Sequence, residues 1–135
     1  MKRILLIATG GTIACKQTAS GLAPQLGAKE LLSYVRDRAE NVESIELFRM
    51  DSSNVQPEEW RAIAQAVADN MHNADGIVIT HGTDTMAYTS SMLSFMLRGI
   101  KIPVVLTGAQ YPMGMDGSDA AANLGDALTA ARELP

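Results

Sequence analysis

The chain has 135 residues, of which 47% are hydrophobic and 19% are charged, and its formal net charge is −4. These values predict one domain over residues 1–135 with a buried core, and the negative charge argues against a nucleic-acid partner. No apolar run reaches the roughly 20 residues of a membrane span, and the run after Arg3 is shorter than the roughly 7–15 residues of a signal-peptide core. The single cysteine, Cys15, excludes an internal disulfide, and we expect a cytoplasmic protein that does not act at a membrane.

Apolar patterning predicts strands and helices that alternate along the chain. In chain order, strands are predicted at 2–8, 42–50, 76–80 and 102–108, and helices at 28–38, 56–72, 85–98 and 119–133. Residues 12–27 show no sustained period, so we expect a mobile loop there. This order predicts an α/β fold in which a doubly wound, mostly parallel sheet lies between two helix layers, as in flavodoxin-like and Rossmann-like domains.

Ligands of such folds bind at the carboxyl ends of the strands, so the turns after the predicted strands form the candidate site. These turns read ATGGT (8–12), MDSSN (50–54), THGTDT (80–85) and LTGAQYP (106–112). All four carry hydroxyl, carboxylate or amide groups, and such a pocket suits a small zwitterion, because hydroxyls bind a carboxylate and an aspartate binds an ammonium. The turns contain no phosphate-binding motif, metal-ligand set or cysteine pair, so we expect no cofactor and no metal.

The glycine pair in ATGGT has more than one interpretation. The next glycine after Gly10 and Gly11 is Gly21, and no Gly-Lys pair follows, so the dinucleotide and P-loop patterns are both absent. The glycines could simply allow a positive φ at a tight turn, with Thr12 acting as a cap. Alternatively, the turn presents Thr12 as a nucleophile for acyl transfer.

The other turns also have a purely structural interpretation. Asp84 can be the N-terminal cap of the helix at 85–98, and Ser118 with Asp119 can cap the last helix. His81, at a strand end, is more simply a hydrogen-bonded structural residue than a base. Turn chemistry alone could account for the four polar residues of the second turn, which are Asp51, Ser52, Ser53 and Asn54.

The pair TGGTIA and THGTDTM, about seventy residues apart, resembles the bacterial-type L-asparaginases, and MDSSN with the following Pro-Glu-Glu-Trp looks like their cytoplasmic type I branch. The resemblance covers the whole chain. It implies hydrolysis of L-asparagine to L-aspartate and ammonia through an acyl ester, without metal or cofactor, with L-glutamine as the alternative substrate. It implies that Thr12 is the nucleophile and that Thr83 and Asp84 are its catalytic partners. Substrate binding is implied for Asp51, Ser52, Ser53, Thr83 and Asp84, with Ser52 on the α-carboxylate and Asp84 on the α-ammonium.

Two departures from the family pattern limit what this chain is expected to do alone. Leu22 stands where many members carry a tyrosine that helps to activate the threonine, and Tyr111 lies in a different turn. The family is about twice as long, and its catalytic lysine lies beyond residue 135. The lysines nearest in kind, Lys16, Lys29 and Lys101, stand in no matching motif. We therefore expect residues 1–135 to be the N-terminal domain of a parent that forms dimers or tetramers, without its second domain.

Two other functions stay open beside hydrolysis. A chain that lacks the lysine could bind aspartate or asparagine without turnover. The asparaginase-like subunit of a tRNA-dependent amidotransferase shares these motifs, but it usually carries an extra N-terminal domain, whereas MKRILLIATGGT begins at the strand itself.

Overall fold

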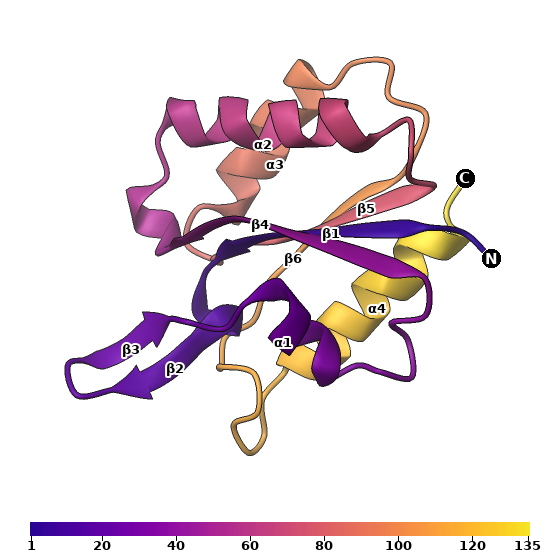
Figure 1. Cartoon of the computed structure of the whole chain (residues 1–135). Coiled ribbons are helices and arrows are strands. Elements are labelled where there is room, and N and C mark those ends of the chain that lie inside the picture. The colour runs from indigo at the N-terminus through magenta and orange to yellow at the C-terminus, as the bar shows by residue number, and fades with distance from the viewer.

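The computed structural model describes residues 1–135 and has a parallel sheet at its centre (Figure 1). The strands pair in the order β4-β1-β5-β6, and each neighbouring pair is parallel. Their bounds are β1 Ile4–Gly10, β4 Val42–Met50, β5 Gly76–Thr80 and β6 Val104–Thr107. The registers pair Ala8 with Thr80 and Thr80 with Thr107, so these strands end together at one edge of the sheet.

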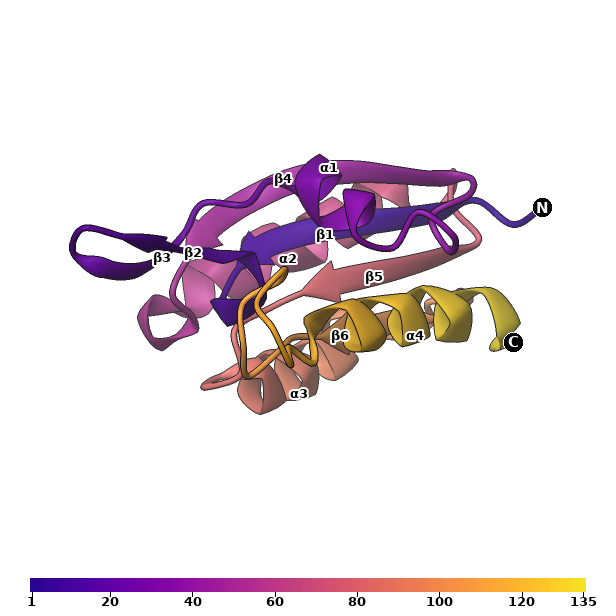
Figure 2. The same ribbon diagram turned by 90° about the horizontal axis from the view of Figure 1, so that it is seen from below.

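Helices cover both faces of this sheet. α1 (Ala28–Ser33) and α4 (Ala120–Glu133) lie on one face, whereas α2 (Pro57–Asn70) and α3 (Met86–Met96) lie on the other (Figures 1 and 2). The chain continues from β1 to the neighbour on one side, β4, and from β5 to the neighbour on the other side, β6. The predicted three-layer, doubly wound α/β fold is therefore confirmed, and the winding direction changes between β1 and β5, where ligands of such folds bind.

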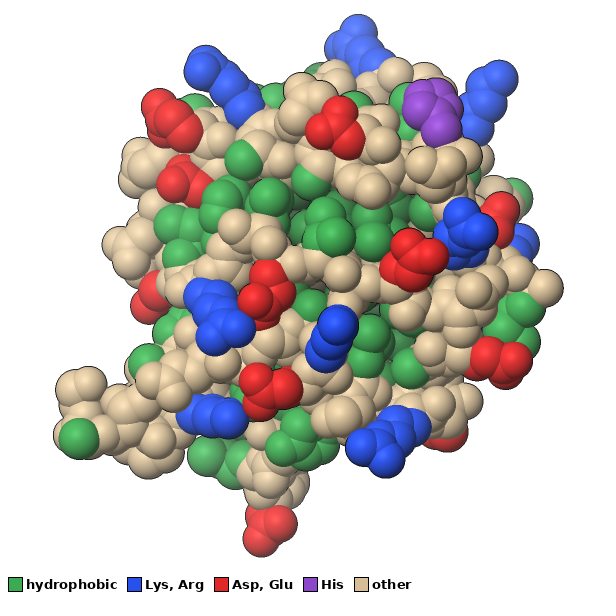
Figure 3. All heavy atoms as spheres, viewed as in Figure 1, with side chains coloured by type: hydrophobic (Ala, Val, Ile, Leu, Met, Phe, Trp, Pro, Cys, Tyr) green, Lys and Arg blue, Asp and Glu red, His purple; other side chains and the backbone are tan.

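The core lies on both sides of the two central strands. β1 and β5 are buried along their whole length, as expected for strands covered by helices on both faces. Successive side chains point to opposite layers, so Leu6 and Val78 pack with α1 and α4, while Ile7 and Ile79 pack with α2. The edge strand β4 is only partly buried, and Figure 3 shows hydrophobic side chains among charged ones on the face that carries it.

The helices begin close to the predicted positions, but two of them are shorter than predicted. α1 ends at Ser33 because Tyr34 and Val35 donate to carbonyls three residues back, which are bonds of tight turns and not of an α-helix. α3 ends at Met96, and Gly99 then turns the chain with a φ of +81°. None of the helices has the length and apolar character that a membrane span needs.

Residues 12–27, where the sequence showed no period and a mobile loop was expected, contain regular secondary structure. A short 3₁₀ helix, η1 (Thr12–Ala14), leads into a hairpin of β2 (Cys15–Thr18) and β3 (Gly21–Pro24), which projects from the body (Figures 1 and 2). Thr18 Oγ1 closes its turn by donating to the carbonyl of Gly21 at 2.6 Å. Because most side chains of the hairpin lie outside the core, burial imposes no apolar alternation on this sequence.

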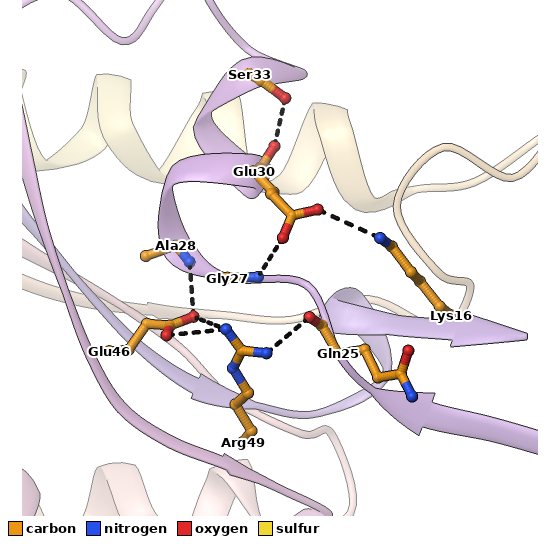
Figure 4. A network of polar contacts seen from close by, with 8 residues as sticks. All are labelled: Lys16, Gln25, Gly27, Ala28, Glu30, Ser33, Glu46 and Arg49. Carbon is orange, nitrogen blue, oxygen red and sulfur yellow. Dashed lines mark hydrogen bonds and ion pairs between the residues drawn. The ribbon is translucent and has the colours of Figure 1, made fainter. Parts of the chain in front are cut away.

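A polar network holds the base of this hairpin against β4 (Figure 4). The Arg49 guanidinium donates to the carbonyl of Gln25 at 3.0 Å and pairs with Glu46, which also accepts from the Ala28 N–H at 3.2 Å.

A second ion pair joins the hairpin to α1, because Lys16 of β2 pairs with Glu30 at 3.3 Å. The pKa of Glu30 lies below its usual value, chiefly because the backbone N–H of Gly27 donates to its carboxylate and also because of Lys16. The hairpin therefore leaves the body at a fixed place beside the carboxyl end of β1.

Candidate active site

Glycines bring three of the candidate turns into close contact. A Cβ placed on Gly11 would lie 2.5 Å from the backbone nitrogen of Gly82, and a Cβ on Gly82 would lie 2.5 Å from Ser52 Oγ. Side-chain atoms essentially never approach so closely, so only glycine fits at these two positions. The turns that follow β1, β5 and β4 therefore meet at Gly11, Gly82 and Ser52, at the switch point of the sheet.

The first turn presents the Thr12 side chain without using it structurally. Gly10 and Gly11 have φ values of +104° and +80°, so the predicted positive-φ turn is present. The N-cap of η1 is Gly11 and has no side-chain cap bond, so the interpretation of Thr12 as a cap is wrong. Thr12 is the first residue of η1, is half-buried, and its hydroxyl makes no hydrogen bond within the chain. A hydroxyl held this way can act on a ligand.

The turn after β5 carries Thr83 and Asp84 and contacts the turn after β1, which carries Thr12. The N-cap of α3 is Thr85, and Asp84 makes no capping bond, so the interpretation of Asp84 as a cap is also wrong. Thr85 Oγ1 instead donates to the Ser52 carbonyl at 2.8 Å and fixes this turn to the turn after β4. Thr83 is half-buried and Asp84 is exposed. Neither side chain makes a hydrogen bond within the chain.

In the turn after β4, some polar side chains have a structural role, whereas the hydroxyl of Ser52 has none. Asp51 caps the short 3₁₀ helix η2 (Ser52–Asn54), because its carboxylate accepts from both the backbone N–H and the hydroxyl of Ser53 at 2.9 Å. Turn chemistry thus accounts for Asp51 and Ser53. Ser52 is buried against Gly82 and makes no side-chain hydrogen bond, so turn chemistry does not explain its hydroxyl.

His81 is a structural residue, as its position at a strand end suggested. Its Nδ1 lies 2.7 Å from the Gly82 carbonyl, which can only accept, so Nδ1 carries the proton. Trp60 Nε1 donates to Thr89 Oγ1 at 3.0 Å, and that hydroxyl donates to His81 Nε2 at 2.9 Å. Burial lowers the pKa of His81. Both ring nitrogens are engaged away from Thr12, so His81 is not placed to take its proton.

The turn after β6 is held by the start of α4. Asp119, which the sequence suggested as a helix cap, makes no side-chain cap bond. Its carboxylate instead accepts from the backbone N–H groups of Gln110 and Tyr111 at 3.0 and 3.1 Å. The bond from Gln110 is the largest cause of a lowered pKa of Asp119, and the bonds from Tyr111 and the Asn123 side chain lower it further. The N-cap residue of α4 is Asp119 itself, and the hydroxyl of Ser118, one residue earlier, accepts from the Ala120 N–H at 3.0 Å.

The charge of the site is negative. The pKa of the Cys15 thiol is raised mainly by burial and further by the charge of Asp51, which places that carboxylate near the start of the hairpin. The turns that bear the candidate residues also carry Asp84, but they contain no lysine or arginine. Two carboxylates among hydroxyls suit a ligand that carries an ammonium group.

The lysines and the leucine noted in the sequence lie elsewhere. Lys16 pairs with Glu30 at the base of the hairpin, Lys29 is exposed on α1, and Lys101 lies before β6, at the opposite end of the sheet. Leu22 is half-exposed near the tip of the hairpin, and Tyr111 is exposed in the turn after β6. Sequence reasoning missed the contacts of Gly82 and the bond of Thr85, although a glycine inside a polar turn is a common sign of close backbone approach.

Comparison with known proteins decides the family. The sequence model of the family described as "Asparaginase, N-terminal" matches residues 3–134. The chain belongs to this asparaginase family. Among curated relatives, an L-asparaginase from Thermococcus kodakarensis is 47% identical over 97% of this chain and 41% of its own length. One subunit of a glutamyl-tRNA(Gln) amidotransferase from Saccharolobus islandicus is 40% identical over 98% of this chain and 31% of its own length.

Solved asparaginase structures share the fold. The Thermococcus kodakarensis enzyme superposes with a TM-score of 0.88 at 48% identity, covering 96% of this chain and 40% of that one. L-asparaginase I from Vibrio cholerae gives 0.82 at 40% identity, over 97% and 41% of the two chains. A probable cytoplasmic L-asparaginase from Campylobacter jejuni gives 0.84 at 32% identity, over 97% and 42%. This asparaginase-family chain thus spans about two fifths of the length of these relatives.

Proposed function

We propose that this chain supplies the nucleophile and the substrate pocket of an amidohydrolase that converts L-asparagine and water to L-aspartate and ammonia. The observation that carries the proposal is the contact of Gly11 with Gly82 and of Gly82 with Ser52, which gathers Thr12, Ser52, Thr83 and Asp84 at the switch point. Three of these four residues bear hydroxyls that no structural bond occupies. An asparaginase relative with 47% identity supports the substrate class.

The reaction proceeds in two steps through Thr12. Its hydroxyl oxygen attacks the carbon of the side-chain amide, a C–O bond forms, and the C–N bond breaks as ammonia leaves with the hydroxyl proton. Water then attacks the resulting ester, which releases aspartate and regenerates the hydroxyl. Backbone N–H groups of the first turn and near Thr83 are the candidate donors to the oxyanion, since such donors stabilise the charge that develops there.

The remaining residues bind the amino-acid end of the substrate. Ser52 donates to the α-carboxylate, with Asp51 and Ser53 beside it, and Asp84 accepts from the α-ammonium, with Thr83 next to it. The two aspartates and the absence of basic side chains on these turns favour an ammonium over an anion. L-Glutamine is the alternative substrate, because one methylene changes binding by only about 1–3 kcal/mol.

A second candidate is binding of L-aspartate or L-asparagine without turnover. The observation that favours it is the lack of a base at Thr12, because His81 is engaged at both nitrogens and its pKa is lowered. The 40% identity to the amidotransferase relative keeps ammonia transfer to another protein chain as a related alternative within the same chemistry.

Two measurements on the same protein separate these functions. Hydrolysis predicts ammonia release when L-asparagine is added, whereas binding alone predicts heat on calorimetric titration with L-aspartate and no ammonia. If L-aspartate gives no heat and L-asparagine gives no ammonia, this chain does not form the proposed pocket on its own. We further propose a cytoplasmic location and assembly with further copies of the chain, on the strength of the Campylobacter relative's description and of the family membership.

A further inference from the structure

A second concave site lies at the end of the sheet opposite the candidate active site. It is a hollow of about 480 Å³, within the range of roughly 300–1,000 Å³ that is usual for small-molecule sites. The carboxyl ends of α2 and α3 and the segment that leads into β6 form its walls. Figure 1 shows this segment passing the end of α2 before it descends to β6.

The lining of this hollow is apolar and positively charged. Six of its ten residues are hydrophobic, and they include Met71, Leu97 and Ile100. The remaining side chains include Arg98 and Lys101, and no carboxylate is among the lining residues. Neither cation belongs to an ion pair of the chain, and the guanidinium of Arg98 lies 5.8 Å from the ring centroid of Phe95.

The ends of two helices also contribute charge here. Each helix carboxyl end carries roughly half a negative charge, so α2 and α3 together bring about one. Arg98 and Lys101 bring two full positive charges, so the hollow keeps a net positive charge of about one before His72 is counted. An anionic group is therefore attracted to the rim, while the hydrophobic lining favours an apolar body.

We propose that this hollow is a binding site for a small amphipathic anion, namely a carboxylate on an apolar chain or ring, distinct from the amino-acid site at the other end of the sheet. The apolar part lies against Met71, Leu97 and Ile100, and the carboxylate accepts from Arg98 and Lys101. His72 adds an imidazole on the same rim. Aspartate and asparagine lack the apolar body, so this site selects a different class of ligand.

Calorimetric titration of the chain with three eight-carbon probes tests the proposal. Sodium octanoate has an apolar chain and a negative carboxylate, octan-1-ol has an apolar chain without charge, and octylammonium has an apolar chain with a positive charge. We expect octanoate to bind with one site and with at least about threefold higher affinity than octanol, and octylammonium to bind more weakly than octanol. Added salt is expected to weaken octanoate binding and leave octanol binding unchanged.

Variants assign the binding to the hollow. Arg98→Gln and Lys101→Gln are each expected to weaken octanoate binding by about two- to fivefold, and the double variant to remove its advantage over octanol. A double variant with the same change of net charge, Arg36→Gln with Arg61→Gln, alters exposed residues outside the hollow and is expected to leave binding unchanged. Circular dichroism checks that each variant is folded.

Three results would overturn the proposal. One is equal affinity for octanoate and octanol, and another is octanoate binding that the Arg98 and Lys101 variants do not change. The third is the absence of binding by all three probes, which is also the result expected if a second copy of the chain covers the hollow.

Discussion

The structure changes the interpretation of Asp84, which the sequence could have explained as a helix cap. It is exposed, caps no helix and lies on the turn that contacts both Gly11 and Ser52. If it holds the α-ammonium of the ligand, Asp84→Asn removes a charged hydrogen bond and weakens L-aspartate binding by at least about tenfold. Calorimetry measures this loss, and Asp37→Asn, an exposed aspartate without a side-chain bond, is the control. Equal affinity of wild type and Asp84→Asn would exclude Asp84 from the pocket.

At the scale of an element, the turn after β1 depends on Gly11. Gly11→Ala is expected to lower the free energy of unfolding by about 1–2 kcal/mol because of the positive φ. The steric overlap of the new Cβ with the Gly82 backbone is expected to lower it by about 1–3 kcal/mol more. Gly99 has nearly the same φ, +81° against +80°, but a Cβ there meets nothing within 4 Å. Urea unfolding should therefore show a clearly larger loss for Gly11→Ala than for Gly99→Ala. Similar losses would mean that the close approach of the turns is unimportant.

The turn after β6 makes a second prediction at this scale. Asp119→Asn removes the carboxylate that accepts from Gln110 and Tyr111, and the melting temperature is expected to fall, whereas Asp116→Asn in the same loop has little effect. The pKa of Asp119 is lowered in the folded chain, so its contribution exists at neutral pH and disappears as pH falls through that lowered value. Melting curves at neutral and acidic pH check this, and a difference that grows on acidification would contradict it.

Several elements could be predicted because burial selects their sequence. β5 is fully buried and reads as a continuous apolar run, and α2 begins at Pro57 with Glu59 accepting from the Gln56 N–H at 2.8 Å. The β2–β3 hairpin could not be predicted, because it projects from the core and its turn depends on a local Thr18 bond. The site turns were identified from strand ends, but only coordinates could separate Asp51, which caps a helix, from Ser52, which does not.

At the scale of the whole molecule, His81 links folding to pH. Burial lowers its pKa below the ordinary value near 6.5, so below that pH the unfolded chain takes up a proton that the folded chain excludes. The free energy of unfolding should fall on acidification, by at most about 1.4 kcal/mol per pH unit from this group. His81→Gln loses this contribution and His72→Gln keeps it, which urea unfolding at about pH 7.5 and 5.5 can measure. The same pH dependence in His81→Gln as in wild type would contradict the assignment.

The two ends of the sheet have different chemistry. Hydroxyls and carboxylates gather at the carboxyl ends of the strands, whereas cations and apolar side chains line the hollow near the start of β6. A ligand at one end need not contact the residues at the other, so variants of the hollow and variants of the turns can be studied independently.

The proposed hydrolysis depends on Thr12, and ammonia release from L-asparagine by the wild-type chain, Thr12→Ser and Thr12→Ala tests that dependence. If Thr12 is the nucleophile, release needs the hydroxyl at position 12, so Thr12→Ala falls to the background rate while Thr12→Ser, which keeps a hydroxyl, exceeds it. L-Aspartate binding by Thr12→Ala, measured in parallel, shows that the pocket is intact. Release by Thr12→Ala at a wild-type rate that exceeds the background would contradict the assignment of Thr12 as the nucleophile.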